Sequence, residues 1–223
     1  MSEFLDDLRG ISFDDFVAYA FDRPVPVGRE PNWWHSGEDT VVLVVDASLQ
    51  LRHSALLFHD PLFLTARFSA EQIEQGFWFL CHDVSDYAEF FPRLLWRDDA
   101  PLDLRVEAVR AMFDLYAKLF APFPTEAATY MWWDLLAEEA LEEKGNFQLP
   151  SPDQEAVRRE MVSTIARILQ LEPRHCQEAA LHGLNHVATA EEREPLIDAF
   201  LASRGVDDKL RSYALACRAG RAQ

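Results

Sequence analysis

Apolar positions recur every three to four residues through most of the chain, which is the spacing of an amphipathic helix. A first short helix is predicted at 12–22, with Ser12 as its N-cap. Capping boxes, in which a Ser or Thr is followed three residues later by Gln or Glu, predict helix starts at Ser69, Ser151 and Thr189. Prolines and glycines between apolar stripes predict loops and set the bounds of further helices at 85–97, 101–121, 125–144, 174–187 and 208–219.

The segment 38–59 carries two opposing signals. The run 41–45 is rich in valine and on its own is typical of a buried strand. No glycine or proline interrupts the segment, however, and Val41, Val45, Leu49 and Leu56 recur at helical spacing. We therefore predict one helix over 38–59, because no convincing partner strand is found elsewhere and a single strand cannot form a sheet.

These patterns predict an all-α fold of about nine helices, stacked as antiparallel pairs with no significant sheet. The length of 223 residues fits one helical domain, 1–223. A subdivision follows the composition: an N-terminal helix and aromatic loop at 1–37, central helices at 38–150, and a helical C-terminal part at 151–223. Within that last part, an apolar stripe is formed by Leu210, Tyr213, Ala214 and Cys217, with Tyr213 as its large anchor. The last helix is therefore expected to pack against 174–187 and 190–204.

A shift of 34 residues places 159–181 on 193–215, with matching Arg-Glu and Ala-Leu pairs. Few positions are identical, so chance is the alternative explanation, but the period is typical of helical-repeat arrays. Three further stretches are distinctive: YMWWDLL at 130–136, CQEAALHGLNH at 176–186 and LRSYALACRAGRAQ at 210–223.

With these stretches the chain resembles HEAT-type helical repeats. It also resembles a group of uncharacterised bacterial proteins whose C-terminal half is all-helical and HEAT-like. The resemblance covers most of residues 40–223 and implies an α-solenoid-like stack that continues to the C-terminus. HEAT-like arrays generally bind other proteins along their surface, and the resemblance implies no catalytic activity.

The charge balance excludes some partners. The chain has 21 Lys and Arg against 38 Asp and Glu, a net charge of −17. Such a chain repels nucleic acid and anionic membranes and attracts basic proteins. Solubility alone is the simpler explanation of this charge.

The compartment is expected to be the cytoplasm. The start, MSEFLDDLRG, does not resemble a signal peptide, and no apolar run is long enough to span a membrane. The three cysteines are widely spaced, which fits a reducing compartment.

Three histidines are the best candidates for metal chemistry. His175, His182 and His186 are separated by seven and four residues, so they lie on one stripe of a helix. A pair at i, i+4 can chelate zinc or another divalent metal. The alternative is a polar edge between helices, with the imidazoles bonded to loop carbonyls or carboxylates. Gly183, within the same helix, indicates a close approach of a neighbouring helix.

Four other residues are candidates for interaction. The core is the expected place for most of the tryptophan rings, but an exposed one would mark a binding patch, and the candidates are Trp33, Trp34 and Trp132. Asp134 stands in an otherwise apolar helical run, which indicates either a buried acid or, as we favour, a partner for an arginine such as Arg159 or Arg167.

No catalytic residue or cofactor is assigned, because the sequence contains no nucleotide-binding, nucleophile-elbow or zinc-finger motif. The leading hypothesis is an interaction or scaffold protein, in a sharper form an acidic inhibitor or immunity-type protein that binds a basic partner. The alternative is a metal-binding protein or enzyme that uses His175, His182 and His186. The oligomeric state is left open.

Overall fold

The computed structural model describes residues 4–28, 33, 41–81, 91–123, 125, 127–142, 150–203 and 205–222. These residues are mostly helical, which confirms the all-α prediction. They contain eleven α-helices, more than the nine or so expected: α1 (Phe13–Phe21), α2 (Ala47–His59), α3 (Leu64–Arg67), α4 (Ala70–Cys81), α5 (Phe91–Trp96), α6 (Leu102–Leu115), α7 (Ala128–Glu142), α8 (Pro152–Ile168), α9 (Arg174–Val187), α10 (Ala190–Ala202) and α11 (Asp208–Arg218).

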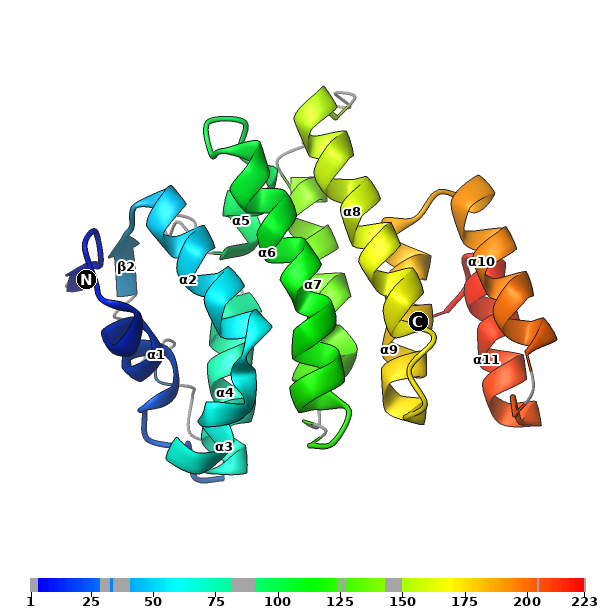
Figure 1. Ribbon diagram of the computed structural model, residues 1–223, viewed down its shortest axis with the longest axis horizontal. Helices are drawn as coiled ribbons and strands as arrows, with labels where there is room; N and C mark the ends of the chain where they lie inside the picture. Colours follow the sequence, from blue (N-terminus) through cyan, green and yellow to red (C-terminus); the bar gives the residue numbers. More distant parts are fainter. Residues whose placement is uncertain are drawn as a thin grey trace.

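The helices lie side by side along the long axis of the molecule, in chain order from one end to the other (Figure 1). One row is made by α2, α6 and α8, each packed on the next. A second row is made by α4, α7, α9 and α11. The packing of α8 on α9 connects the two rows, and α10 packs on α11 and α9. A 3-10 turn, η2 (Pro61–Phe63), follows α2, and a π-helical turn, η3 (Tyr116–Phe120), extends α6.

The prediction of one helix over 38–59 is wrong at its start. Residues Val41–Val44 form strand β2, which pairs in parallel with β1 (Phe4–Asp7). The helix begins only after Asp46, whose side chain accepts a hydrogen bond from the Leu49 backbone N–H at 2.8 Å. This N-cap divides the segment without a glycine or proline. The partner strand contains two aspartates, which is why its sequence did not indicate a strand.

Most of the other helix starts follow the sequence, although α7 begins at Ala128 and not at 125, and the predicted start at 85 lies outside the described residues. The capping boxes at Ser69, Ser151 and Thr189 are all formed, with the partners Gln72, Gln154 and Glu192. The docking of the last helix is also confirmed, because α11 packs on α9 and α10 with the stripe Leu210, Ala214 and Cys217 buried. The three cysteines are free and buried.

The core is rich in aromatic rings. Trp132 and Trp133, neighbours on α7, both have an exposed fraction of 0%. Trp132 packs edge-on against Phe58 and Phe77, and Trp133 lies against α9 at Gly183. A Cβ atom at Gly183 would stand 2.8 Å from the Trp133 Cβ, so the predicted close helix approach is confirmed.

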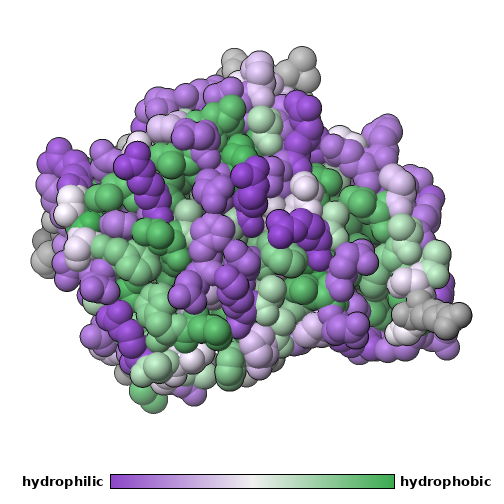
Figure 2. All heavy atoms as spheres, viewed as in Figure 1, coloured by the Kyte–Doolittle hydropathy of each residue, from purple (hydrophilic) through white to green (hydrophobic). Residues whose placement is uncertain are grey.

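Most of the face in Figure 2 is hydrophilic, with apolar patches that are larger in the half that contains α1 to α4. Among the described residues the large apolar side chains that reach solvent are Val25, Val27, Leu56, Leu62, Phe123 and Leu215. None of the helices in the described ranges is long and apolar enough to cross a membrane.

Candidate functional site

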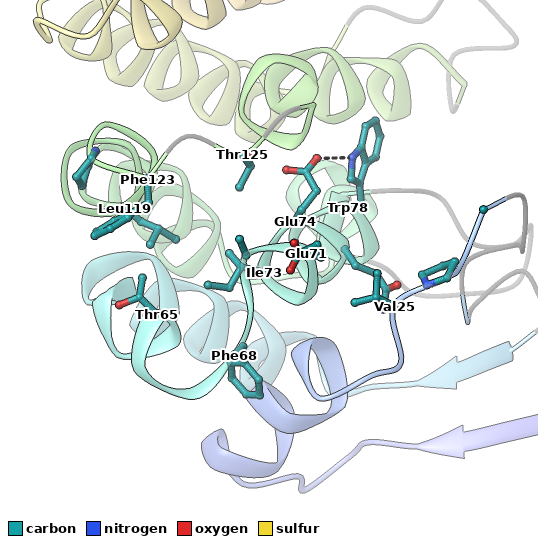
Figure 3. A pocket seen from close by; sticks show the side chains of 15 residues that line it. Val25, Thr65, Phe68, Glu71, Ile73, Glu74, Trp78, Leu119, Phe123 and Thr125 are labelled. Atoms are coloured by element: carbon teal, nitrogen blue, oxygen red, sulfur yellow. Dashed lines mark hydrogen bonds between the residues drawn. The ribbon is translucent and has the colours of Figure 1, made fainter.

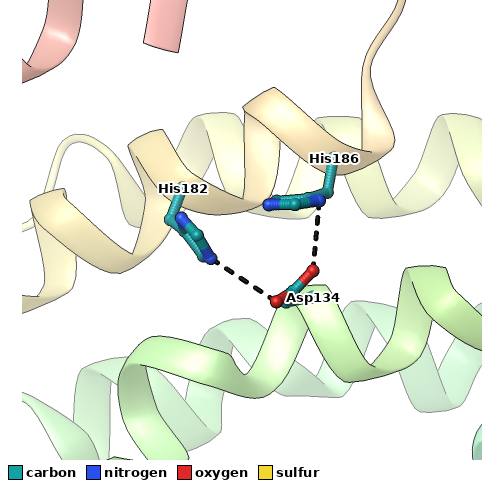
Figure 4. Close-up of side chains that lie close together, drawn as sticks. All are labelled: Asp134, His182 and His186. Carbon is teal, nitrogen blue, oxygen red and sulfur yellow. Dashed lines mark ion pairs between the residues drawn. The ribbon is translucent and has the colours of Figure 1, made fainter. Parts of the chain in front are cut away.

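Two of the predicted histidines converge on the predicted acid. His182 and His186 extend from α9 towards Asp134 on α7, the helix packed against it (Figure 4). The His186 Nδ1 lies 3.1 Å from Asp134 Oδ1, and the His182 Nε2 lies 3.7 Å from Asp134 Oδ2. One nitrogen or oxygen atom from each of the three side chains lies within 4.8 Å of the other two. The described residues therefore contain a compact group of two imidazoles and one carboxylate.

His182 is the most enclosed member of the group, with only 4% of its side chain exposed. Its ring stacks on Tyr130, with the ring centroids 4.4 Å apart. Its Nδ1 lies 3.2 Å from the Tyr130 hydroxyl and 3.3 Å from that of Tyr213, and the two hydroxyls are hydrogen-bonded to each other at 2.6 Å. Burial and the neighbouring His186 lower the pKa of His182, so its neutral form is favoured.

The other ring nitrogen of His182 has no hydrogen-bond partner. Its Nε2 is buried and faces the Asp134 carboxylate, yet 3.7 Å is too long for a hydrogen bond. His186 is more open, with 32% of its side chain exposed. The group thus has one buried unsatisfied nitrogen and one side that solvent reaches.

His175 does not belong to this group, contrary to the three-histidine prediction. Its Nε2 is hydrogen-bonded to the Phe120 carbonyl oxygen at 2.9 Å, at the end of η3. Seven residues of helix separate His175 from His182 by about 10 Å along the axis, because each residue rises about 1.5 Å. The two imidazoles share a stripe but cannot reach one ion.

The favoured pairing of Asp134 with an arginine is also wrong. Arg159 pairs with Glu155, 3.3 Å away, and the Arg167 guanidinium lies over the Phe113 ring. Asp134 pairs with two histidines instead. Its partners lie some fifty residues away on α9, and the sequence alone does not show which face of α9 meets α7.

Among the tryptophan candidates, Trp132 is fully buried, so its prediction as an exposed contact is wrong. Trp33 is half-buried, edge-on to Tyr19 and under the Arg23 guanidinium. Trp34 lies outside the described residues.

A second feature, which the sequence analysis did not identify, is a cavity of about 870 Å³ beside α4. It lies between α4, the segment that follows α1, and the turn that follows η3 (Figure 3). Its walls are mostly apolar, and Val25 and Phe123 at its edge are exposed. The apolar residues that line it are Val25, Pro26, Phe68, Ala70, Ile73, Trp78, Leu119, Pro122 and Phe123.

Two buried acceptor oxygens belong to residues that line this cavity. Glu74 Oε1 accepts hydrogen bonds from Trp78 Nε1 and from the backbone N–H groups of Ala127 and Ala128 at the start of α7. Its second oxygen, Oε2, is buried without a hydrogen-bond partner among the described residues. Gln75 donates to the Pro24 carbonyl, and its own Oε1 is likewise buried and unpartnered.

The sequence pattern alone could have indicated some of these site residues. Tyr130 stands four residues before Asp134 on the same helix, so both lie on one face. Glu74 and Trp78 have the same spacing. Tyr213 belongs to the stripe that is predicted to pack on 174–187, the helix of His182, whereas Gln75 has no such signal.

No protein-family model, no curated protein and no solved structure matches the chain. The resemblance to HEAT-type proteins therefore stays a prediction.

Proposed function

We propose that this protein is an interaction protein, built as a HEAT-like array of helix pairs, that binds a basic protein partner in the manner of an acidic inhibitor or immunity protein. The observation that carries the proposal is the cavity beside α4, with its unpartnered acceptors Glu74 Oε2 and Gln75 Oε1. The net charge of −17 supports it, because an acidic surface raises the rate of encounter with a cationic protein.

The arrangement of the helices supports the array. The 34-residue sequence shift brings most of the pair α8–α9 onto the pair α10–α11. Each pair places one helix in contact with the pair before it, as α9 packs on α7 and α11 packs on α9. Nearest-neighbour packing of this kind is the principle of helical-repeat proteins.

The cavity has the chemistry to receive an arginine or lysine side chain. The methylene groups of such a side chain would pack on the apolar walls, for example Ile73 and Phe123. Its positive end would interact with the Glu74 carboxylate. The oxygens Glu74 Oε2 and Gln75 Oε1 are buried without partners, and a shift of the lining side chains would let the terminal N–H groups satisfy them. Glu74 is already held in place by its three donors, so little side-chain entropy is lost on binding.

A labelled peptide tests this recognition. The peptide carries one arginine between two leucines, and a matched peptide carries the neutral isostere citrulline in place of arginine. Fluorescence anisotropy at low ionic strength measures binding to the full chain. We expect the arginine peptide to bind about tenfold more tightly, which corresponds to about 1.4 kcal/mol, and to weaken as salt is added.

Two single-charge variants locate the binding. Glu74→Gln keeps an oxygen that can accept the backbone hydrogen bonds but removes the charge in the cavity. Glu191→Gln removes an exposed charge in the first turn of α10, at the opposite end of the molecule (Figure 1). Only the first variant should lose the preference for arginine. Equal binding of the two peptides, or equal effects of the two variants, would refute the proposal.

A further inference from the structure

The group on α7 and α9 has the spacing of a metal site. Zinc binds imidazole nitrogen and carboxylate oxygen at about 2.0–2.2 Å, so ligand atoms around a tetrahedral ion lie roughly 3.3 Å apart. The two distances run to different oxygens of Asp134: His182 Nε2 lies 3.7 Å from Oδ2, and His186 Nδ1 lies 3.1 Å from Oδ1. One ligand atom from each of the three side chains lies within 4.8 Å of the other two, so the ligand atoms would draw closer together around an ion. Small movements of side chains would complete the geometry, with no change in the helices.

The unpartnered nitrogen of His182 points to a cation as the missing group. If Nε2 carries the proton, its N–H faces a carboxylate oxygen that is too distant to accept it. If Nε2 is unprotonated, its lone pair faces the negative charge of Asp134. A metal ion between the two side chains would satisfy the nitrogen and the carboxylate together.

The other ring nitrogen of His182, Nδ1, already has hydrogen-bond partners that would fix the ring for metal binding. Metal-binding histidines commonly use their second nitrogen to hold a hydrogen bond that fixes the ring. Here Nδ1 lies next to the paired hydroxyls of Tyr130 and Tyr213. When Nδ1 carries the ring proton, one hydroxyl can accept it and can itself be hydrogen-bonded to the other hydroxyl.

We propose that Asp134, His182 and His186 bind one Zn²⁺ ion per chain. Two imidazoles favour zinc over calcium or magnesium, which prefer ligands that are all oxygen. Three protein ligands leave a fourth position of the tetrahedron for water or another small ligand. The partly exposed His186 gives solvent a route to the ion.

Calorimetric titration with ZnCl₂ tests the site, on full-length protein made without a histidine tag and stripped with a chelator. Asp134→Asn and His186→Ala each remove one ligand. His175→Ala removes a histidine from the same helix that lies outside the group, and so is the matched control. Far-UV circular dichroism of each variant verifies that the fold is kept. His182→Ala is avoided, because that ring is packed in the core.

We expect one Zn²⁺ per chain in the wild type and in His175→Ala. Loss of an outer hydrogen-bond partner of a zinc ligand costs 10- to 100-fold in affinity, so loss of a ligand should cost at least about 100-fold. Co²⁺ should give the intense visible absorption of a four-coordinate ion in the same two proteins only. The proposal is overturned if the wild type binds no zinc, if the ligand variants bind as tightly as the wild type, or if His175→Ala loses binding to the same extent.

Discussion

At the scale of single residues, His59 gives the protein a dependence on pH near neutrality. Its ring lies between α2 and α6, with Nδ1 2.8 Å from an Asp114 oxygen and Nε2 2.8 Å from a Glu107 oxygen. Partial burial alone would lower the pKa of His59, but the hydrogen bonds and charges of the two carboxylates outweigh it, and the pKa is raised. A raised pKa means that the folded state binds the proton more tightly than the unfolded chain does.

We therefore expect the contribution of His59 to be complete below the pKa of an unfolded histidine, about 6.5, and to be lost as the pH rises through the higher folded value. Since the ring is partly exposed, the contribution should be about 0.5 kcal/mol. Urea unfolding of the wild type and His59→Gln between pH 5.5 and 9 measures it. The difference in unfolding free energy should shrink as the pH rises; a constant difference across this range would contradict the charged pairing. Asp60→Asn, which removes a neighbouring exposed carboxylate, serves as the control.

The metal group shows what single residues could and could not predict. The spacing of His182 and His186 was sufficient to place both on one face, and the polar Asp134 in an apolar run was recognised as unusual. Their meeting depends on how α7 and α9 are rotated against each other, which local sequence does not determine. The angle around the helix places His175 on the same stripe as the other two histidines, but the rise along the helix axis separates it from them.

At the scale of elements, the close packing of α7 on α9 depends on Gly183. In an isolated helix, replacing this glycine with alanine would stabilise by about 1 kcal/mol. Here the new Cβ would stand 2.8 Å from both Cβ and Cγ of Trp133, atoms too close to the α7 backbone to move aside. Forcing extra atoms into a packed core typically costs about 1–3 kcal/mol, so the clash should outweigh the gain in helix propensity.

Gly183→Ala is therefore expected to lower the melting temperature by several degrees, since about 1 kcal/mol corresponds to roughly 2–4 °C in a chain of this size. Differential scanning calorimetry measures the shift. A variant that melts at or above the wild-type temperature would show that the two helices can separate without loss. Because the substitution would also move Asp134 away from His182, it should weaken zinc binding as well.

The segment 41–45 shows why one element was predicted wrongly. Its valines indicate a strand, but the uninterrupted run and the lack of an evident partner strand favour a helix. Asp46 ended that run by capping α2, and the partner strand was a short acidic segment near the start of the chain. Helix starts with capping boxes were predicted correctly, because those signals are local; strand pairing depends on distant residues.

At the scale of the whole molecule, the last helix needs its neighbours to bury its apolar stripe, Leu210, Ala214 and Cys217. Among the described residues, α11 makes most of its contacts with α9 and α10, and Tyr213 adds a hydrogen bond to Tyr130 on α7. It is tied to them by polar contacts too: Arg218 donates to Asp198 at 2.8 Å, and Arg174 on α9 pairs with Asp207 at the N-cap of α11. Its contribution should therefore be to the stability of the entire C-terminal part of the protein.

The same substitution, leucine to alanine, at a buried and at an exposed position of α11 tests how much the packing of this helix contributes to stability. Leu210 is 3% exposed and faces the stack, whereas Leu215 is 50% exposed. Leu210→Ala should destabilise the protein by about 2–4 kcal/mol, because it removes buried methyl groups and leaves a cavity. Leu215→Ala should change the stability by no more than about 0.5 kcal/mol.

Removal of residues 205–223 should cost more than Leu210→Ala, because it uncovers the flank of α9 as well. Thermal melts followed at 222 nm compare the four proteins; if the truncated chain melts within a couple of degrees of the intact one, α11 is an appendage and the helices do not stabilise one another as a stack.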